Sequence, residues 1–435
     1  MYLFSESGRW KGIKSLVCDI FALSIFLVNV HGMIALLAVL VVVASVWVVR
    51  GDGTCQISRS ESCNLSKFPV GESVLIKPGG STKCLLGEPY SFQVIRGDKS
   101  KILFHFQGGG ACWDSASILI NACSERVYQV PADGIFDIKS LQNRYRTYTI
   151  ISVLYCSGDL HIGDYDWDYD VLGFDKKRVY QRGATNFRSV ITWLQKQVSL
   201  GEIGVRNNLD RLVLSGSSAG ALGLQVWSGH LLARLPQARL RAVIVDSLAG
   251  LFPNDARGLP AVSALLKQYG VCKYITTLTK ETSRFGPACV NGTLTVQNIF
   301  SGNMKANPSV PFAFLQSKRD EVQLGFFDGI DLIFGMHSDM LDGTSFSERV
   351  EAFLQSYNIK FRNWIVYWID GDTHQYLTEP WFYKASVLGS SAGKSQLGVP
   401  LLHQWVAALP LGAGQNLTSF GADGYQGKTF IQRPR

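Results

Sequence analysis

Short apolar runs alternate along the chain with stretches whose apolar residues recur at helical spacing. Phe187, Val190 and Leu194 follow such a spacing, which predicts a helix over residues 185–198, and a second helix is predicted over 219–235. Six short apolar runs predict strands: 102–107, 148–156, 211–214, 240–245, 311–315 and 364–369. Strands that alternate with helices are typical of a mostly parallel sheet with helices on both faces. The pattern therefore predicts an α/β fold.

One catalytic domain over residues 84–435 accounts for this alternation. A segment at about residues 250–308 interrupts it, and we interpret this segment, which carries two cysteines and a glycosylation sequon, as an insertion over the edge of the sheet. Residues 51–83 are rich in Gly, Ser and Cys. We interpret them as a stalk and a loop that leads into the catalytic domain.

The first fifty residues carry a separate signal. Residues 15–49 are almost wholly apolar, and the stretch 33–49 alone is nearly long enough to cross a bilayer. Three basic side chains precede the run: Arg9, Lys11 and Lys14. This charge bias keeps the N-terminus cytoplasmic and sends the rest of the chain to the lumen. Because the run is longer than the apolar part of a cleaved signal peptide, residues 1–50 are predicted to form a cytoplasmic N-terminus and a transmembrane signal anchor. A signal that is cleaved late and a buried core helix are the alternatives.

Cysteine usage indicates an oxidising compartment. Cys18 falls in the apolar N-terminal run, and eight cysteines remain: Cys55, Cys63, Cys84, Cys112, Cys123, Cys156, Cys272 and Cys289. An even number in an exported chain predicts four disulfides, and no CxxC pair or spaced histidine pair points to a metal site. Three N-glycosylation sequons agree with a lumenal body: Asn64, Asn291 and Asn416. The chain is therefore predicted to be a single-pass membrane protein of the secretory pathway, or a secreted protein if the N-terminal segment is cleaved.

The charge of the chain argues against nucleic acid as a partner. The formal net charge is +8 over 435 residues, and the basic residues are scattered without a dense Lys/Arg block. No signature of a nucleic-acid-binding module is present, so we exclude this class of function.

The strongest local signal for chemistry lies around Ser218. Residues 216–220 form a Gly-x-Ser-x-Gly motif between a predicted strand and a predicted helix. This is the context of a nucleophile elbow, in which the serine stands at a sharp turn and faces the helix N-terminus. We therefore predict an α/β-hydrolase type of fold with Ser218 as the nucleophile.

A second signal is the run Gly108, Gly109 and Gly110, directly after the predicted strand 102–107. Hydrolases of this type place a glycine loop here, and its N–H groups bind the oxyanion together with that of the residue after the nucleophile. The predicted oxyanion-hole donors are therefore Gly109, Gly110 and Ala219. A phosphate-binding loop is excluded because no Lys-Ser/Thr pair follows the glycines.

The general base must be a histidine that follows the serine if the order is serine, acid, histidine. Histidines that precede Ser218 or lie in the helix after it are excluded: His31, His105, His161 and His230. Of the remaining three, His374 follows the predicted strand 364–369, whereas His337 and His403 have no such strand before them. Because α/β folds place their sites at the carboxyl ends of strands, His374 is the predicted base.

Two aspartates compete for the role of the triad acid. Asp246 ends the strand 240–245, and Asp320 follows the strand 311–315 after a short loop. Either strand end could supply the carboxylate that holds the imidazole. Position between serine and histidine favours Asp320, and Asp246 stays as the alternative.

Several separated motifs, in matching order, resemble the pectin acetylesterase/Notum family. They are FQGGGACW at 106–113, YCSGD at 155–159, SGSSAG at 215–220, DEVQL at 320–324 and the loop around His374. Together they span roughly residues 80–411. The resemblance implies an extracellular carboxylesterase with a Ser–His–Asp triad. The family's Asp-x-x-Gln motif falls on Asp320 and Gln323, which favours Asp320 as the acid.

The resemblance also implies a set of disulfides, and at a few positions this chain differs from the family. It implies the pairs Cys112–Cys123 and Cys84–Cys156, and with them Cys272–Cys289 and Cys55–Cys63. The family has an aromatic residue where Gly110 stands here, and a cysteine beside the catalytic histidine where this chain has Thr373 and Gln375. These departures concern the acyl pocket and its rim.

The sequence therefore predicts a serine carboxylesterase that needs no cofactor. The first substrate expectation is acetyl on a cell-wall polysaccharide such as pectin. Removal of a fatty acyl group from a protein or lipid, as the resemblance to Notum implies, is the second. A catalytically silent, membrane-anchored binding protein on the same fold is the third, because a fold alone does not settle function.

Overall fold

The structure is a computed structural model in which Thr54–Arg435 forms one compact unit. It describes residues 53–171, 175–206, 208–334, 341–394, 396, 398–409, 416–421 and 426–431. The predicted cytoplasmic N-terminus and signal anchor, residues 1–50, lie outside the described residues. Within those ranges, no helix combines the length and the apolar character that a membrane crossing requires.

A large sheet runs through the described unit. Its strands follow one another in this order: β1 (Thr54–Gln56), β2 (Ser73–Lys77), β3 (Phe92–Ile95), β5 (Tyr148–Val153), β4 (Asp98–Phe106), β8 (Asn208–Ser217), β9 (Gln237–Asp246), β10 (Phe312–Ser317), β11 (Trp364–Ile369), β12 (Asn416–Gly421) and β13 (Gln426–Ile431). Neighbouring strands are parallel from β5 to β12 and antiparallel at β2–β3, β3–β5 and β12–β13. The mostly parallel sheet predicted from the sequence is confirmed.

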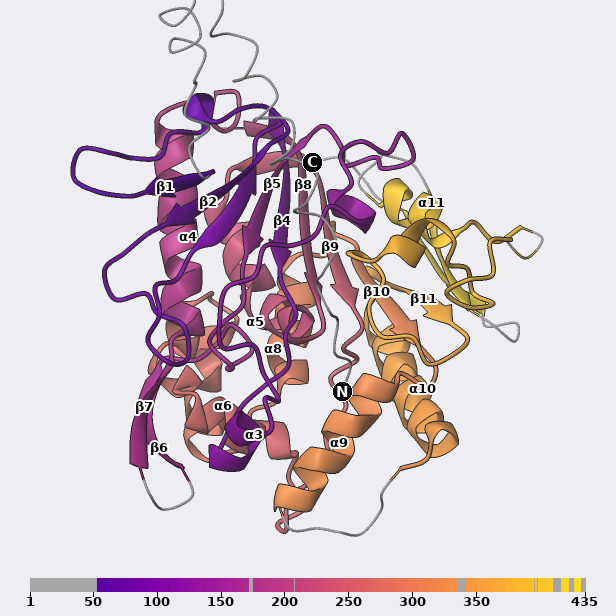
Figure 1. The fold of residues 1–435 in the computed structure, drawn as a ribbon. Helices are drawn as coiled ribbons and strands as arrows, with labels where there is room; N and C mark the ends of the chain where they lie inside the picture. Colours follow the sequence, from indigo (N-terminus) through magenta and orange to yellow (C-terminus); the bar gives the residue numbers. More distant parts are fainter. Residues whose placement is uncertain are drawn as a thin grey trace, which may run out of the picture. The chain divides into compact units, whose positions relative to one another are not determined.

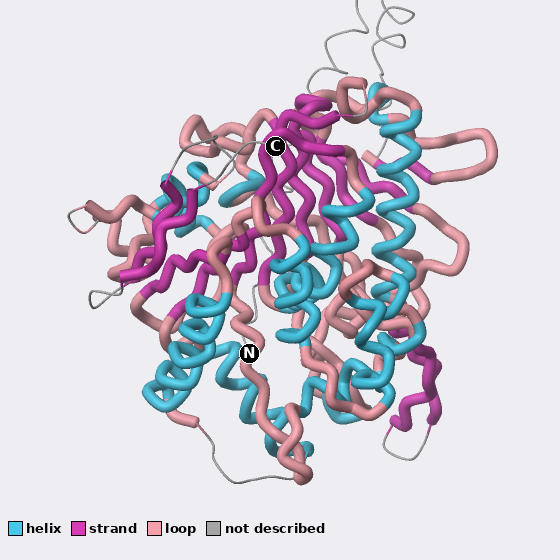
Figure 2. The backbone as a smooth tube through the Cα atoms, turned by 180° about the vertical axis from the view of Figure 1, so that it is seen from behind, coloured by secondary structure: helices cyan, strands magenta, loops and turns pink. Residues whose placement is uncertain are grey.

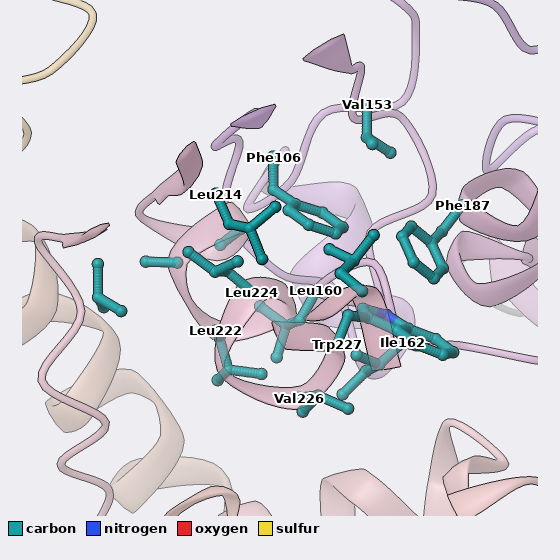
Figure 3. Close-up of a cluster of buried hydrophobic side chains, with 14 of the residues drawn as sticks. Phe106, Val153, Leu160, Ile162, Phe187, Leu214, Leu222, Leu224, Val226 and Trp227 are labelled. Carbon is teal, nitrogen blue, oxygen red and sulfur yellow. The ribbon is translucent and has the colours of Figure 1, made fainter. Parts of the chain in front are cut away.

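Alternation of side chains along the central strands divides the core into two layers. On β8, Leu212 and Leu214 join one buried cluster and Val213 joins the other. The first layer is covered by four helices: α4 (Gly183–Ser199), α5 (Ala219–Arg234), α8 (Val296–Ala306) and α10 (Gly343–Lys360). In Figure 3, Phe106 and Leu214 of the sheet lie over Leu224 of α5. Because both faces of these strands are buried, their sequences are continuous apolar runs.

The opposite layer is covered by shorter elements. They are α11 (Leu402–Ala408) and the 3₁₀ helices η2 (Gly134–Phe136) and η6 (Pro380–Tyr383). Figure 2, which shows the molecule from behind, has the longer helices of the first layer in front of the strands, on the other face. Helices therefore cover both faces, as predicted, but on this second face only short ones do.

Three helices lie beyond the carboxyl ends of the central strands (Figure 1): α3 (Ser115–Leu119), α6 (Ala261–Gln268) and α9 (Glu321–Phe334). A separate antiparallel hairpin, β6 (Tyr165–Val171) and β7 (Asp175–Gln181), packs there against the disulfide Cys112–Cys123 through Tyr169 and Val179. This end of the sheet is where α/β folds place their sites.

The structure differs from the prediction of a stalk over residues 51–83. Strands β1 and β2 of this segment belong to the main sheet and pair with each other. Along β2, Val74 and Ile76 are buried while their neighbours are half-exposed, which is the two-residue period of a strand with one buried face. The abundance of Gly and Ser around this short strand hid that period in the sequence.

Residues 250–308, which we interpreted as an insertion over the edge of the sheet, connect two strands in the middle of the sheet. These strands, β9 and β10, are neighbours. The segment folds into α6, α7 (Gly286–Val290), α8 and three short 3₁₀ helices: η3 (Val271–Lys273), η4 (Ile275–Thr277) and η5 (Thr282–Phe285). Its last helix, α8, packs on α5. The segment is therefore an enlarged crossover connection between parallel strands.

Candidate active site

The turn at Ser218 joins β8 to α5 and has a backbone conformation that few residues other than glycine adopt. Ser218 has φ 53° and ψ −123°, and its N–H donates to the carbonyl oxygen of Asp246 at 2.9 Å. A Cβ atom at Gly216 would collide with the carbonyl oxygen of Gly220, and one at Gly220 would collide with that of Phe106. The two glycines therefore let the strand, the turn and the helix approach one another, and the predicted elbow geometry is present.

His374 lies in the loop after β11 and is paired with Asp320. Its Nδ1 lies 2.8 Å and 2.9 Å from the two carboxylate oxygens of Asp320. Because a carboxylate only accepts, Nδ1 carries the proton and Nε2 is left as the basic nitrogen. Nε2 is buried and has no hydrogen-bond partner among the described residues. The imidazole is therefore in the tautomer that a general base needs.

Asp320 is fully buried directly before α9, where Gln323 holds it. The N–H and the side-chain amide of Gln323 donate to its two oxygens at 2.9 Å and 2.7 Å. The amide oxygen of Gln323 in turn accepts the N–H of Ala249 at 3.0 Å. The predicted Asp-x-x-Gln motif therefore fixes the carboxylate that orients His374.

Asp246, the alternative acid, makes no contact with the imidazole of His374. Its carboxylate accepts the N–H groups of Tyr376 and Leu377 and lies 2.9 Å from the Ser217 hydroxyl. Burial raises the pKa of Asp246 above its ordinary range, although these donors act in the opposite direction. Of the two candidates, the structure places only Asp320 against His374.

The glycine loop is held in a short ribbon whose second strand is residues 122–124. Ser124 N–H donates to the carbonyl of Gly109 at 2.8 Å, and Ala111 N–H donates to the carbonyl of Ala122 at 3.0 Å. In a trans peptide the C=O and N–H point in opposite directions, so the N–H of Gly110 points away from Ser124. Within the described structure, the N–H groups of Gly109 and Gly110 donate to no protein group, nor does that of Ala219, the first residue of α5.

Gly110 stands where the family was expected to have an aromatic residue, and the backbone explains why a glycine is needed here. Gly110 has φ 73°, and a Cβ atom there would collide with the carbonyl oxygen of Ala122. Gly109 has φ 147°, and a Cβ atom on it would lie 2.5 Å from the hydroxyl oxygen of Ser124. The ribbon therefore accepts no side chain at either position, and an aromatic residue at Gly110 would need a different loop.

Two residues for which the sequence predicted no role, Tyr155 and His161, donate hydrogen bonds to backbone carbonyls in and next to the glycine loop. The Tyr155 hydroxyl accepts the N–H of Leu160 at 2.8 Å, so its own proton goes to the carbonyl of Gly110 at 3.0 Å. His161 Nε2 donates to the carbonyl of Gln107 at 2.8 Å. Burial lowers the pKa of His161 to about 4, which keeps the ring neutral. The motif YCSGD at 155–159 was the available signal, but a motif alone does not show what its side chains touch.

A narrow apolar cavity opens between Ser218 and His374. The centre of a water-sized group can occupy about 50 Å³ within this cavity. Its polar rim includes Ser218, His374, Gln323, Gly110 and Ala219, and its apolar walls come from α5, α6, α9 and nearby loops: Leu160, Leu222, Leu248, Leu251, Phe252, Leu265, Val322, Phe326, Phe327 and Ile330. The predicted nucleophile, the predicted base and two of the predicted oxyanion donors therefore line one cavity.

A second, polar cavity of about 550 Å³ meets the first at Gly110 and Phe326. Five of its other lining residues, on or next to the ribbon, carry hydrogen-bonding side chains: Asn121, Ser124, Glu125, Arg126 and Tyr128. The Tyr128 side chain is exposed, and the charges of Glu125 and Arg126 balance. An ester that spans both cavities would place an apolar part in one and a polar part in the other.

All four predicted disulfides are present: Cys55–Cys63, Cys84–Cys156, Cys112–Cys123 and Cys272–Cys289. They indicate an extracellular or secretory-pathway protein. Among the described residues, Cys55, Glu61 and Cys63 are close enough to hold a metal ion, but their two sulfurs form a disulfide and are not thiolate ligands. Of the sequons, Asn291 is exposed and Asn64 is half-buried, and the Asn416 side chain lies outside the described residues. Glycosylation stays a prediction.

Comparison with known proteins gives a family match. The model of the pectinacetylesterase family matches residues 70–374, which include Ser218, Asp320 and His374. The solved structure of the Wnt deacylase Notum from Drosophila is similar, with 17% sequence identity and a TM-score of 0.49, over 73% of this chain and 89% of that chain. No curated protein matches the chain.

Proposed function

The chain belongs to the pectinacetylesterase family and is a carboxylic ester hydrolase, and from this premise we propose that it works through Ser218, His374 and Asp320. The observation that carries the proposal is the pairing of His374 Nδ1 with Asp320 at 2.8 Å beside a cavity that Ser218 also lines. Nucleophile, base and orienting acid then stand in the roles of a serine-hydrolase triad.

The proposed reaction is acyl transfer in two steps. His374 Nε2 takes the proton of the Ser218 hydroxyl as its oxygen attacks the ester carbonyl. The oxyanion binds the free N–H groups of Gly109, Gly110 and Ala219. The C–O bond to the alcohol then breaks, the alcohol leaves with the proton from Nε2, and an acyl-Ser218 remains. Water that gives its proton to Nε2 attacks this ester, and the carboxylic acid leaves as Ser218 regains its proton.

The size of the apolar cavity supports a short acyl group. The centres of water-sized groups can occupy only about 50 Å³ of it. A short acyl chain needs less of this space than a long one. Acetyl is therefore the proposed acyl group, in agreement with the first expectation from the sequence.

The polar cavity supports a hydroxyl-rich alcohol. Asn121, Ser124 and Arg126 offer hydrogen bonds, and the exposed ring of Tyr128 offers a flat apolar surface. Polar groups beside an aromatic face suit sugar rings, so the proposed substrate is an O-acetylated polysaccharide such as pectin.

A fatty acyl ester remains the second candidate because one observation favours it. Apart from its polar rim, the acyl cavity is lined by apolar residues, among them Leu160, Phe327 and Ile330. Widening this cavity by movement of α9 would be required before a long chain could enter. The small volume is the reason for placing this candidate second.

The test is hydrolysis of p-nitrophenyl esters from acetate to palmitate by the full-length protein, together with release of acetate from acetylated pectin. Acetate is expected to be the preferred acyl group. Ser218→Ala is expected to lower kcat/KM by about 10⁴-fold or more, because the nucleophile is lost while the oxyanion donors remain. Ser189→Ala, on the outer helix α4, is the matched control and should retain wild-type activity.

Full activity in Ser218→Ala would overturn the proposed nucleophile. Preference for palmitate over acetate would replace the polysaccharide substrate by the fatty acyl ester. No hydrolysis of any ester by a folded protein with intact disulfides would favour a binding role for this member of the family.

A further inference from the structure

Asp246 is a buried carboxylate held only by neutral donors in the described structure. It is the last residue of β9 and is fully buried. Oδ2 accepts the N–H groups of Leu377 at 2.8 Å and Tyr376 at 2.9 Å and lies 2.9 Å from the Ser217 hydroxyl. Oδ1 lies 3.0 Å from the Ser247 hydroxyl. Since burying a carboxylate is unfavourable unless its oxygens are satisfied, these contacts are what keep it in place.

Asp246 and its hydrogen-bonding partners form a cluster, and one side of this cluster is the loop that carries the proposed base, His374. Ser247 Oγ accepts the N–H of Gln375 at 2.8 Å, so its own proton goes to Asp246. The N–H groups of Gln375, Tyr376 and Leu377 are therefore fixed, the first through Ser247 and the other two by Asp246 itself. These are the three residues that directly follow His374.

The other side of the cluster is the elbow that carries the proposed nucleophile. The Asp246 carbonyl accepts the N–H of Ser218 at 2.9 Å, and the carboxylate contacts the hydroxyl of Ser217, the residue before it. Asp246 thus touches both segments that must be aligned for proton transfer between Ser218 and His374. Catalytic groups must be held to within roughly 0.5 Å for efficient transfer.

We infer that Asp246 is a positioning residue that sets the distance between Ser218 and His374 by holding the elbow and the histidine loop on one carboxylate. The inference rests on the proposed roles of Ser218 and His374 and goes beyond them. Two oxygens are needed for this task. Oδ2 accepts from Leu377, Tyr376 and Ser217, while Oδ1 accepts from Ser247 and, at 3.1 Å, also from the N–H of Tyr376. An amide in its place would turn an NH₂ group toward at least one of these donors.

The experiment compares Asp246→Asn with wild type in the full-length protein. The concentration of competent sites is first titrated with a fluorophosphonate that labels Ser218. We expect kcat per titrated site for p-nitrophenyl acetate to fall by about 10²-fold, the loss typical of a misplacement of about 1 Å. KM should stay close to the wild-type value, because the cavity that receives the acyl group does not include Asp246.

Asp98→Asn is the matched control. Asp98 also accepts hydrogen bonds from a backbone N–H and a serine hydroxyl, but it begins β4 and lies at the opposite end of the sheet strands from the glycine loop. The Asp98→Asn variant loses the same charge as Asp246→Asn, and its kcat per titrated site should equal that of the wild type.

Two single variants keep the inference testable if Asp246→Asn does not fold. Ser217→Ala and Ser247→Ala each remove one hydroxyl from the carboxylate on one side of the cluster. Because both act through Asp246, their effects on kcat should be non-additive in the double variant.

Unchanged kcat per titrated site in Asp246→Asn would overturn the inference, as would a loss explained by fewer titrated sites alone, since that result marks a purely structural residue. Additive effects of the two serine variants would also overturn it. If the wild-type protein itself is neither labelled nor active, the proposed function fails instead.

Discussion

Tyr155 holds the loop of the proposed oxyanion donors through a single atom, its hydroxyl oxygen. Its hydroxyl bridges Leu160 and the carbonyl of Gly110, and its ring lies against that of His161, with ring centres 4.6 Å apart. The peptide on one side of Gly110 is thus held by Tyr155, and the peptide on the other side by Ser124. The direction of the Gly110 N–H is therefore set by contacts on the carbonyl groups of Gly109 and Gly110, which are not among the predicted oxyanion donors.

Replacement of this hydroxyl isolates its effect. Tyr155→Phe is expected to lower kcat for p-nitrophenyl acetate about fivefold, because a lost buried hydrogen bond is worth roughly 1 kcal/mol and about 1.4 kcal/mol is tenfold in rate. The measurement is kcat and KM, together with the free energy of unfolding in urea.

Tyr145→Phe provides the control. It removes a hydroxyl that donates to a buried carbonyl, that of Val406, at 2.9 Å in the other core layer. It should lower stability by a similar amount and leave kcat unchanged. Equal kcat losses in both variants would mean that Tyr155 acts through stability alone.

Helix α9 has two different faces. Phe326, Phe327 and Ile330 line the acyl cavity, and Asp320 sits directly before its first residue. A Cβ atom at Gly325 or Gly329 would meet nothing within 4 Å. The helix that bounds the cavity therefore carries glycines where no packing requires them, and such residues weaken a helix interior.

Gly329→Ala should stabilise the protein. The expected gain is about 0.5–1 kcal/mol in the free energy of unfolding, the difference in helix propensity between the two residues. Gly229→Ala in α5 is the opposite case, because its Cβ would collide with the side chain of Asn303. It should destabilise, and urea unfolding followed by tryptophan fluorescence measures both. Destabilisation by Gly329→Ala would show that α9 packs against something beyond the described contacts.

Sequence reasoning succeeded where the signal was local to one element. Ser218 and His374 stand in short motifs beside long apolar strands, and the structure has these strands where they were predicted. Strand β2 was missed because its apolar residues are few and lie among glycines and serines. Asp246 and Tyr376 lie 130 residues apart, so their contact is set by which strands are neighbours. Position along the chain and the Asp-x-x-Gln motif favoured Asp320 but left Asp246 as an alternative, and in the structure Asp320 is the one that lies against His374.

Buried titratable groups couple the stability of the whole molecule to pH. Burial lowers the pKa of His105 to about 3 and that of His161 to about 4, and burial raises the pKa of Asp159 to about 7. Below pH 6.5 the unfolded chain binds a proton at each histidine and the folded chain does not, so stability falls as the pH falls. Asp159 acts oppositely: the folded carboxyl keeps its proton up to about pH 7, so its contribution is lost as the pH rises from about 4 to 7.

Two protons on the histidines outweigh one on Asp159, so these groups together make stability rise with pH between about 4 and 6.5. Asp159→Asn removes the opposing contribution. The free energy of unfolding should then rise more steeply with pH, by up to about 1.4 kcal/mol per pH unit. Urea unfolding of both proteins at several pH values, with disulfides intact, measures the slopes. Equal slopes would show that Asp159 is ionised in the folded protein across this range.

The ribbon that orients the glycine loop ends beside the disulfide Cys112–Cys123. A chain whose cysteines are still reduced has every residue of the triad but lacks the covalent tie that keeps this ribbon closed. We therefore expect catalytic competence to be acquired late, on oxidation. The redox state of the surrounding compartment would then decide where ester hydrolysis can begin.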